Sequence, residues 1–418
     1  MSARRRPDPL TWLFGSLLAG GITAGLLLTA PLYTNSYAIG THAIGLLVPF
    51  VGAMTFACGA CVLGRFTGRR ALASAVLFVL LCLPFAGLLA SPIVHLEGDD
   101  SYRYSLYAHN ILAERTLWGS DGLLHDVRHY VDQPGYRYYL AATIALLGGE
   151  HRGMQLFDMA VLLLAILALL GVLETRLDRT SFLALAFFLL ASAPYAAKNV
   201  IYGYTEWFVV VVFMLFVLHL VRGHSLTAVI LLALVPFVRQ NLLIVSLILA
   251  GVLVARTRHW WLLLPYTAVL GLPLYHNLRY AGELRFLVEN RGALLSLAGG
   301  PLDDVMEIVR VVGAKIPHYL GYHPEQELLT LAIAVVFAPY GSALSLWLVG
   351  RTRGRQRWLF AAIAAATIAP TLVLGSGSFP RFVYVNLSLV LLSCLALGVP
   401  RAGRPRPSTL PHPASARV

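Results

Sequence analysis

Long apolar segments recur along most of this sequence, and they constrain its fold more than any other feature. Examples are residues 12–32, 43–63, 71–92 and 328–349, each close to the roughly 20 residues that a membrane-spanning helix needs. Of all residues, 58% are hydrophobic and 12% are charged, which is too much apolar surface for the interior of a water-soluble globule. The sequence therefore predicts an all-α polytopic membrane protein, with residues 1–400 as a single transmembrane domain.

The arginines indicate the topology of this domain. They occur in short clusters between apolar segments, at residues 4–6, 65–70, 176–179, 222, 256–258, 351–357 and 401–406. Because cytoplasmic loops are enriched in Lys and Arg, we expect these clusters inside and about twelve crossings between them. Both termini are then cytoplasmic. We expect residues 401–418 to form a basic disordered tail. We interpret the net charge of +12 as a consequence of topology rather than of nucleic-acid binding.

Two long polar loops are expected on the outer face, at residues 93–153 and 276–326. The first contains a segment, residues 138–148, that is apolar but too short to span, and we interpret it as an interfacial or re-entrant helix. A tight hairpin is predicted over residues 226–255. Its turn at residues 238–241 leaves Arg239 at the outer face.

The first outer loop opens with the acidic residues Glu97, Asp99 and Asp100. Neighbouring carboxylates suit general-base catalysis or binding of a divalent cation. The alternative is structural, because Asp99 or Asp100 can cap a helix running from Tyr102 to Leu112. Spacing alone leaves both interpretations open.

Three more groups on the predicted outer side are candidates for a site. Residues 130–139 are rich in tyrosine, which also suits an interfacial aromatic belt. Glu206 begins an apolar segment, where a carboxylate is costly unless paired or functional, and Lys198 is a potential partner. Arg239 and Arg381 break the positive-inside pattern. They suit either a phosphate clamp or contact with lipid headgroups.

Taken in order, these features resemble the GT-C superfamily of polyprenyl-phosphate-sugar glycosyltransferases, in particular the branch of protein O-mannosyltransferases and aminoarabinose transferases. The resemblance covers residues 85–260, with a weaker match at residues 378–398. It implies a GT-C-like bundle whose large first outer loop carries short interfacial helices. Two departures stand out: Gln133 occupies the position of a family cation, and Gly135 that of a second proline.

The resemblance implies an inverting single displacement at the non-cytoplasmic face, with Asp99 or Asp100 as the base. The donor would be a polyprenyl-phosphate sugar and the acceptor a glycan, lipid or protein. A divalent cation, Mg or Mn, at Asp99, Asp100 and Glu206 is a further option. Contacts with donor phosphate or substrate would come from Glu206, Lys198, Arg239, Arg381, Arg137, Gln133, Tyr102 and Tyr139.

Two other classes remain open on the sequence. A secondary transporter, or a flippase of a glycan or lipid precursor, also has about twelve spans, but typically places ionisable residues at the bilayer midplane. A non-catalytic scaffold protein is the third class. Arginine in place of nearly all lysine suggests a GC-rich bacterial genome, and hence the inner (plasma) membrane.

Overall fold

The computed structural model describes residues 67–82, 100–117, 134–201, 203–282, 284, 356–373 and 380–398. These residues form helices and no strand. The elements are α3 (Arg70–Cys82), α5 (Asp100–Glu114), α6 (Pro134–Leu147), α7 (His151–Glu174), α8 (Arg179–Ala191), α9 (Ala193–Ile201), α10 (Thr205–Arg222), α11 (Ser225–Val238), η4 (Gln240–Leu242), α12 (Leu243–Thr257), η5 (Trp260–Leu262), α13 (Leu263–Ala281), α18 (Gln356–Val373) and α19 (Pro380–Gly398).

Three of the described helices are long and apolar enough to cross a membrane: Gly153–Glu174, Thr205–Arg222 and Gln240–Thr257. The predicted all-helical, membrane-like character is therefore confirmed for this part of the chain. The expected spans at residues 12–32, 43–63 and 328–349 lie outside the described residues. The count of about twelve crossings remains a prediction.

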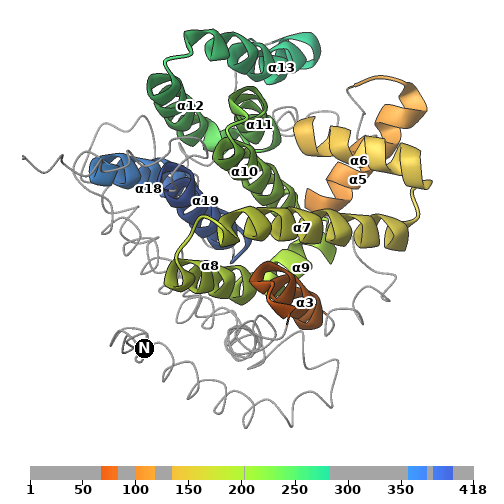
Figure 1. Cartoon of the computed structure of the whole chain (residues 1–418). Coiled ribbons are helices and arrows are strands. Elements are labelled where there is room, and N and C mark those ends of the chain that lie inside the picture. The colour runs from red at the N-terminus through yellow and green to blue at the C-terminus, as the bar shows by residue number, and fades with distance from the viewer. Residues whose placement is uncertain are drawn as a thin grey trace, which may run out of the picture.

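Helix α10 is the central helix of the described bundle (Figure 1) and packs against α7, α9, α11 and α19. Its sequence is apolar on all sides, which is typical of a helix enclosed by others. Helices α7 and α12 are apolar too, but each leaves large side chains exposed, among them Leu164 and Ile244. Such exposed apolar faces are what lipid would cover.

Tight turns connect the central helices. Helix α10 ends at Gly223, whose φ of 88° is in the left-handed region that glycine adopts at low cost. Helix α11 ends at Val238 and η4 begins at Gln240, so Arg239 alone forms the connection, in extended conformation. The tight hairpin predicted at residues 238–241 is confirmed.

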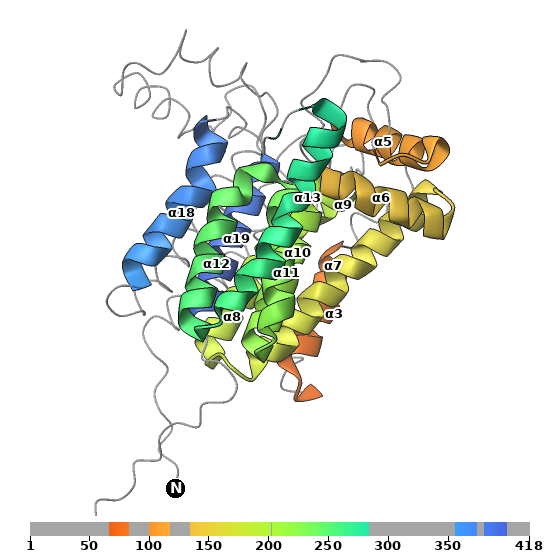
Figure 2. The same ribbon diagram turned by 90° about the horizontal axis from the view of Figure 1, so that it is seen from above.

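Helices α5 and α6 lie crosswise at one end of the bundle, whereas α10, α11, α12 and α13 run side by side (Figure 2). We call this end the α6 end. The segment predicted to be too short to span forms α6, of 14 residues. Gly135 brings α6 against α11: a Cβ atom at this position would lie 2.7 Å from the Phe237 carbonyl oxygen.

Candidate functional site

Buried polar and charged side chains gather at the α6 end, where the apolar segments of several helices begin or stop. Among the described residues they include Arg137, Asp158, Thr205, Glu206, Arg239, Gln240, His276 and Asn277. We call this set the α6-end cluster. Buried charges in an apolar bundle are costly unless paired, so their concentration at one end marks a candidate site.

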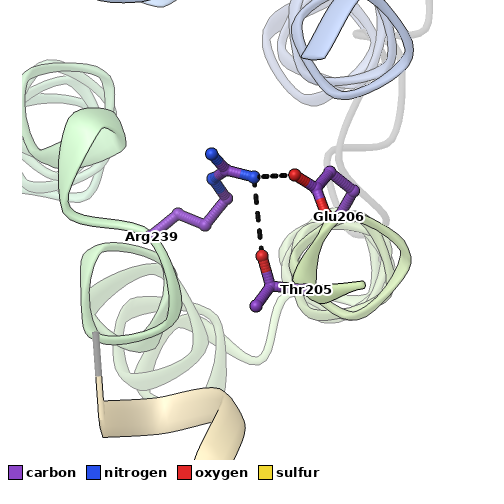
Figure 3. Close-up of polar contacts among 3 residues, drawn as sticks. All are labelled: Thr205, Glu206 and Arg239. Carbon is purple, nitrogen blue, oxygen red and sulfur yellow. Dashed lines mark hydrogen bonds and ion pairs between the residues drawn. The ribbon is translucent and has the colours of Figure 1, made fainter. Parts of the chain in front are cut away.

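An ion pair joins α10 to the α11 hairpin. Arg239 Nη1 donates to Glu206 Oε1 and lies 3.5 Å from Thr205 Oγ1 (Figure 3). Arg239 is 8% exposed and Glu206 is 2% exposed, so protein rather than solvent surrounds the pair. Glu206 is also in the first turn of α10, where the helix dipole favours a negative charge. The carboxylate thus fixes the position of the guanidinium.

The first two turns of α6 contact several helices through consecutive residues, because successive side chains on a helix point about 100° apart. Tyr138 Oη lies 2.5 Å from His276 Nδ1 on α13. Tyr139 donates a hydrogen bond to Asp158 on α7. Burial raises the pKa of Tyr138 and of Tyr139 well above the usual tyrosine value, so both hydroxyls keep their protons.

The two preceding residues, Tyr136 and Arg137, are fully buried. Trp207 Nε1 on α10 donates to Tyr136 Oη at 3.3 Å. The Arg137 guanidinium carbon lies 4.4 Å from the centre of the Tyr107 ring on α5, a cation–π contact. Neither Tyr136 nor Arg137 is exposed at all, so this part of the tyrosine-rich segment packs inside the protein rather than forming an interfacial belt.

Helix α5 packs on α6 through the face that carries Tyr104 and Tyr107. The Tyr104 ring meets the Tyr136 ring edge to face, with centroids 5.4 Å apart. The helix predicted from Tyr102 to Leu112 runs from Asp100 to Glu114.

Several predicted site residues lie outside what the structure describes. Asp99 and Gln133 are not among the described residues. Asp100 is the first residue of α5, and Tyr102, Lys198 and Arg381 are in α5, α9 and α19, but the description does not extend to the side chains of these four residues. Among the predicted residues with described side chains, the structure brings Glu206 and Arg239 into contact.

The structure describes one partner of Glu206, and it is Arg239, 33 positions further along the chain. The side chain of Lys198 is not described, so its pairing with Glu206 stays a prediction. The contact with Glu206 also places Arg239 among buried helices rather than among lipid headgroups. The Arg239 side chain extends from the end of α11 toward α10. Spacing in the sequence does not reveal which side chain the arginine meets.

Sequence reasoning missed Asp158, His276 and Asn277. A signal was present for Asp158, because it is a lone carboxylate near the start of the apolar segment that forms α7. His276 and Asn277 follow an apolar run in α13. Polar residues follow apolar runs at the ends of many helices, so this pattern does not mark a site. The proximity of His276 and Asn277 to α6 depends on packing between distant segments.

Of the three predicted ligands of a divalent cation, Asp99, Asp100 and Glu206, only Glu206 has a described side chain, so this cation site stays a prediction. Glu206, one of its predicted ligands, already accepts a hydrogen bond from Arg239, and a cation beside a guanidinium is disfavoured. Within the described parts of the chain, no group of three or more His, Cys, Asp or Glu side chains is arranged to hold a metal. We therefore derive no step through a metal.

Comparison of the chain with protein-family models, with curated proteins and with solved structures finds no match.

Proposed function

We propose that this chain is a membrane glycosyltransferase of the GT-C type, which transfers a sugar from a polyprenyl-phosphate donor to an acceptor on the non-cytoplasmic side. The observation that carries the proposal is the buried Arg239–Glu206 pair at the α6 end of the bundle, on helices next to α6. A fixed arginine at the end of apolar helices is suited to a phosphate whose lipid tail lies along those helices. The exposed apolar faces of α7 and α12 provide surfaces for such a tail.

The Arg239 guanidinium has the role of stabilising the donor phosphate as it leaves. Glu206 holds the arginine in place before the donor arrives, and a preorganised charge costs no reorganisation during the reaction. Arg137 has a different role, because it is stacked on Tyr107 and joins α5 to α6. Lys198 and Arg381 remain candidates for additional phosphate contacts, each placed near an end of its helix.

Asp100 or Asp99 acts as the base. The acceptor hydroxyl oxygen attacks the anomeric carbon, the bond from that carbon to the phosphate oxygen breaks, and the hydroxyl proton passes to the aspartate. Polyprenyl phosphate leaves with the bonding electron pair. Asp100 begins α5, the helix that packs on α6, and this position favours it as the base.

The test is release of polyprenyl phosphate from a panel of polyprenyl-phosphate sugars by the purified protein in lipid vesicles. We expect turnover by the wild type, and a loss of about 10²–10⁴-fold in kcat with donor binding retained in Asp99→Asn or in Asp100→Asn. Asp178→Asn is the control, because Asp178 Oδ1 accepts a hydrogen bond from the Ser181 backbone N–H at the start of α8, beyond the opposite end of α7.

Two results would contradict the proposal. The first is turnover that neither aspartate variant reduces. The second is an absence of release from every donor, together with movement of a sugar or lipid precursor across the vesicle membrane. That second outcome would identify a transporter or flippase.

A further inference from the structure

Gln240 is a buried polar residue whose burial no described contact explains. It is 2% exposed, begins η4 and directly follows Arg239. Neither its Nε2 nor its Oε1 atom has a hydrogen-bond partner in the described part of the chain. Buried amides are normally hydrogen-bonded, and an amide without partners loses its contacts with water and gains nothing in return.

The position of Gln240 connects it with the proposed donor site. Consecutive Cα atoms are about 3.8 Å apart across a trans peptide, so Gln240 is at the same end of the bundle as the ion pair. Arg239 has extended backbone angles, φ −142° and ψ 105°, which direct successive side chains to different sides. The two residues therefore offer separate contact points, one cationic and one neutral.

The chemistry of a primary amide restricts the ligand group. The Oε1 atom accepts and the Nε2 atom donates, so a partner that satisfies both must itself donate and accept. A sugar hydroxyl does both and carries no charge, whereas a phosphate at neutral pH mainly accepts. We propose that Gln240 recognises ring hydroxyls of the donor sugar while Arg239 holds the phosphate; this inference rests on the proposed function.

The first experiment measures stability without any substrate, by thermal unfolding of the purified protein in lipid nanodiscs. Gln240→Met replaces an amide that lacks partners by an apolar side chain of similar shape, so we expect an unchanged or higher unfolding temperature. Gln155→Met is the matched control. Gln155 is also buried, but its Nε2 donates to the Ile201 carbonyl oxygen at 2.8 Å, so its replacement should lower the unfolding temperature.

The second experiment compares protection against unfolding by polyprenyl phosphate and by polyprenyl-phosphate hexoses and pentoses. In the wild type, we expect at least one sugar-bearing lipid to bind about tenfold more tightly than polyprenyl phosphate, the usual effect of one or two hydrogen bonds. In Gln240→Met, this preference should disappear while binding of polyprenyl phosphate persists. Gln155→Met should keep the preference.

The outcomes separate this inference from the proposed function. If Gln240→Met lowers the unfolding temperature as Gln155→Met does, or keeps the preference for the sugar-bearing lipid, Gln240 does not recognise the sugar although donor binding still stands. If no polyprenyl-phosphate lipid protects the wild type, the proposed function fails and the assignment of Gln240 fails with it.

Discussion

Arg239 and Glu206 are buried together, and the stability of the protein depends on each charge having the other as its partner. Removing one partner of a buried pair leaves an uncompensated charge, which typically costs about 3–5 kcal/mol, whereas replacing both by apolar groups is often nearly neutral. The proposed function gives a reason for keeping the charged pair, because an apolar pair would not attract a phosphate.

We expect Glu206→Met and Arg239→Met each to lower stability by about 3–5 kcal/mol, and the double variant to recover most of that loss. The measurement is thermal unfolding in lipid nanodiscs, with the four proteins compared as a cycle. A double variant whose loss equals the sum of the two single losses would show that the residues are not coupled.

The α6 tyrosines predict a dependence on pH. Burial raises the pKa of Tyr138 and of Tyr139, while in the unfolded chain each titrates near 10. Their contribution to stability is therefore fully present below about pH 10 and is lost as the pH rises beyond it. Tyr138→Phe/Tyr139→Phe should show a smaller fall in unfolding temperature between pH 8 and pH 11 than the wild type. An equal fall would contradict the assignment.

Helix α6 illustrates how far the sequence predicts an element and its partners. Its short apolar stretch predicted a helix that does not span, and its tyrosines marked a candidate site. The contacts of Tyr138 with His276 and of Tyr139 with Asp158 were not predictable, because they join segments 138 and 19 positions apart. Periodicity determines which residues share a helix face, but packing determines which helix that face meets.

Gly135 provides a test of this packing. A Cβ atom there would lie 2.7 Å from the Phe237 carbonyl oxygen, and a main-chain atom has little freedom to move away. We expect Gly135→Ala to lower the unfolding temperature and to reduce polyprenyl phosphate binding by separating α6 from α11. Gly251→Ala in α12 is the control, because a Cβ atom there meets nothing within 4 Å. Helix propensity predicts a small gain for it, about 0.5–1 kcal/mol. Equal behaviour of the two variants would contradict the close contact.

A transferase that acts on the outer face requires the α6 end of the bundle to face away from the cytoplasm. Exposed residues mark the two ends of the bundle. Glu150 is exposed beside the start of α7, at the α6 end. His224 and His259 are exposed at the turns that precede α11 and η5, at the other end. The arginine clusters at residues 222 and 256–258 predict that these turns are cytoplasmic.

Cysteine labelling in intact cells tests this orientation. In a background whose four native cysteines are replaced by alanine, Glu150→Cys should react with a membrane-impermeant maleimide added outside. His224→Cys and His259→Cys should react only after the cells are opened. The reverse pattern would place the α6-end cluster on the cytoplasmic side and remove the basis for an outer-face transferase.

The proposed function depends on the buried ion pair at the α6 end holding the donor phosphate. The most direct test is binding of radiolabelled polyprenyl phosphate to the wild type and to the folded Glu206→Met/Arg239→Met double variant in nanodiscs. We predict saturable binding by the wild type and about a tenfold or greater loss of affinity in the double variant, since a hydrogen bond to a charged group is worth about 1.5–3 kcal/mol. Equal affinity in a double variant that keeps its unfolding temperature would contradict the account.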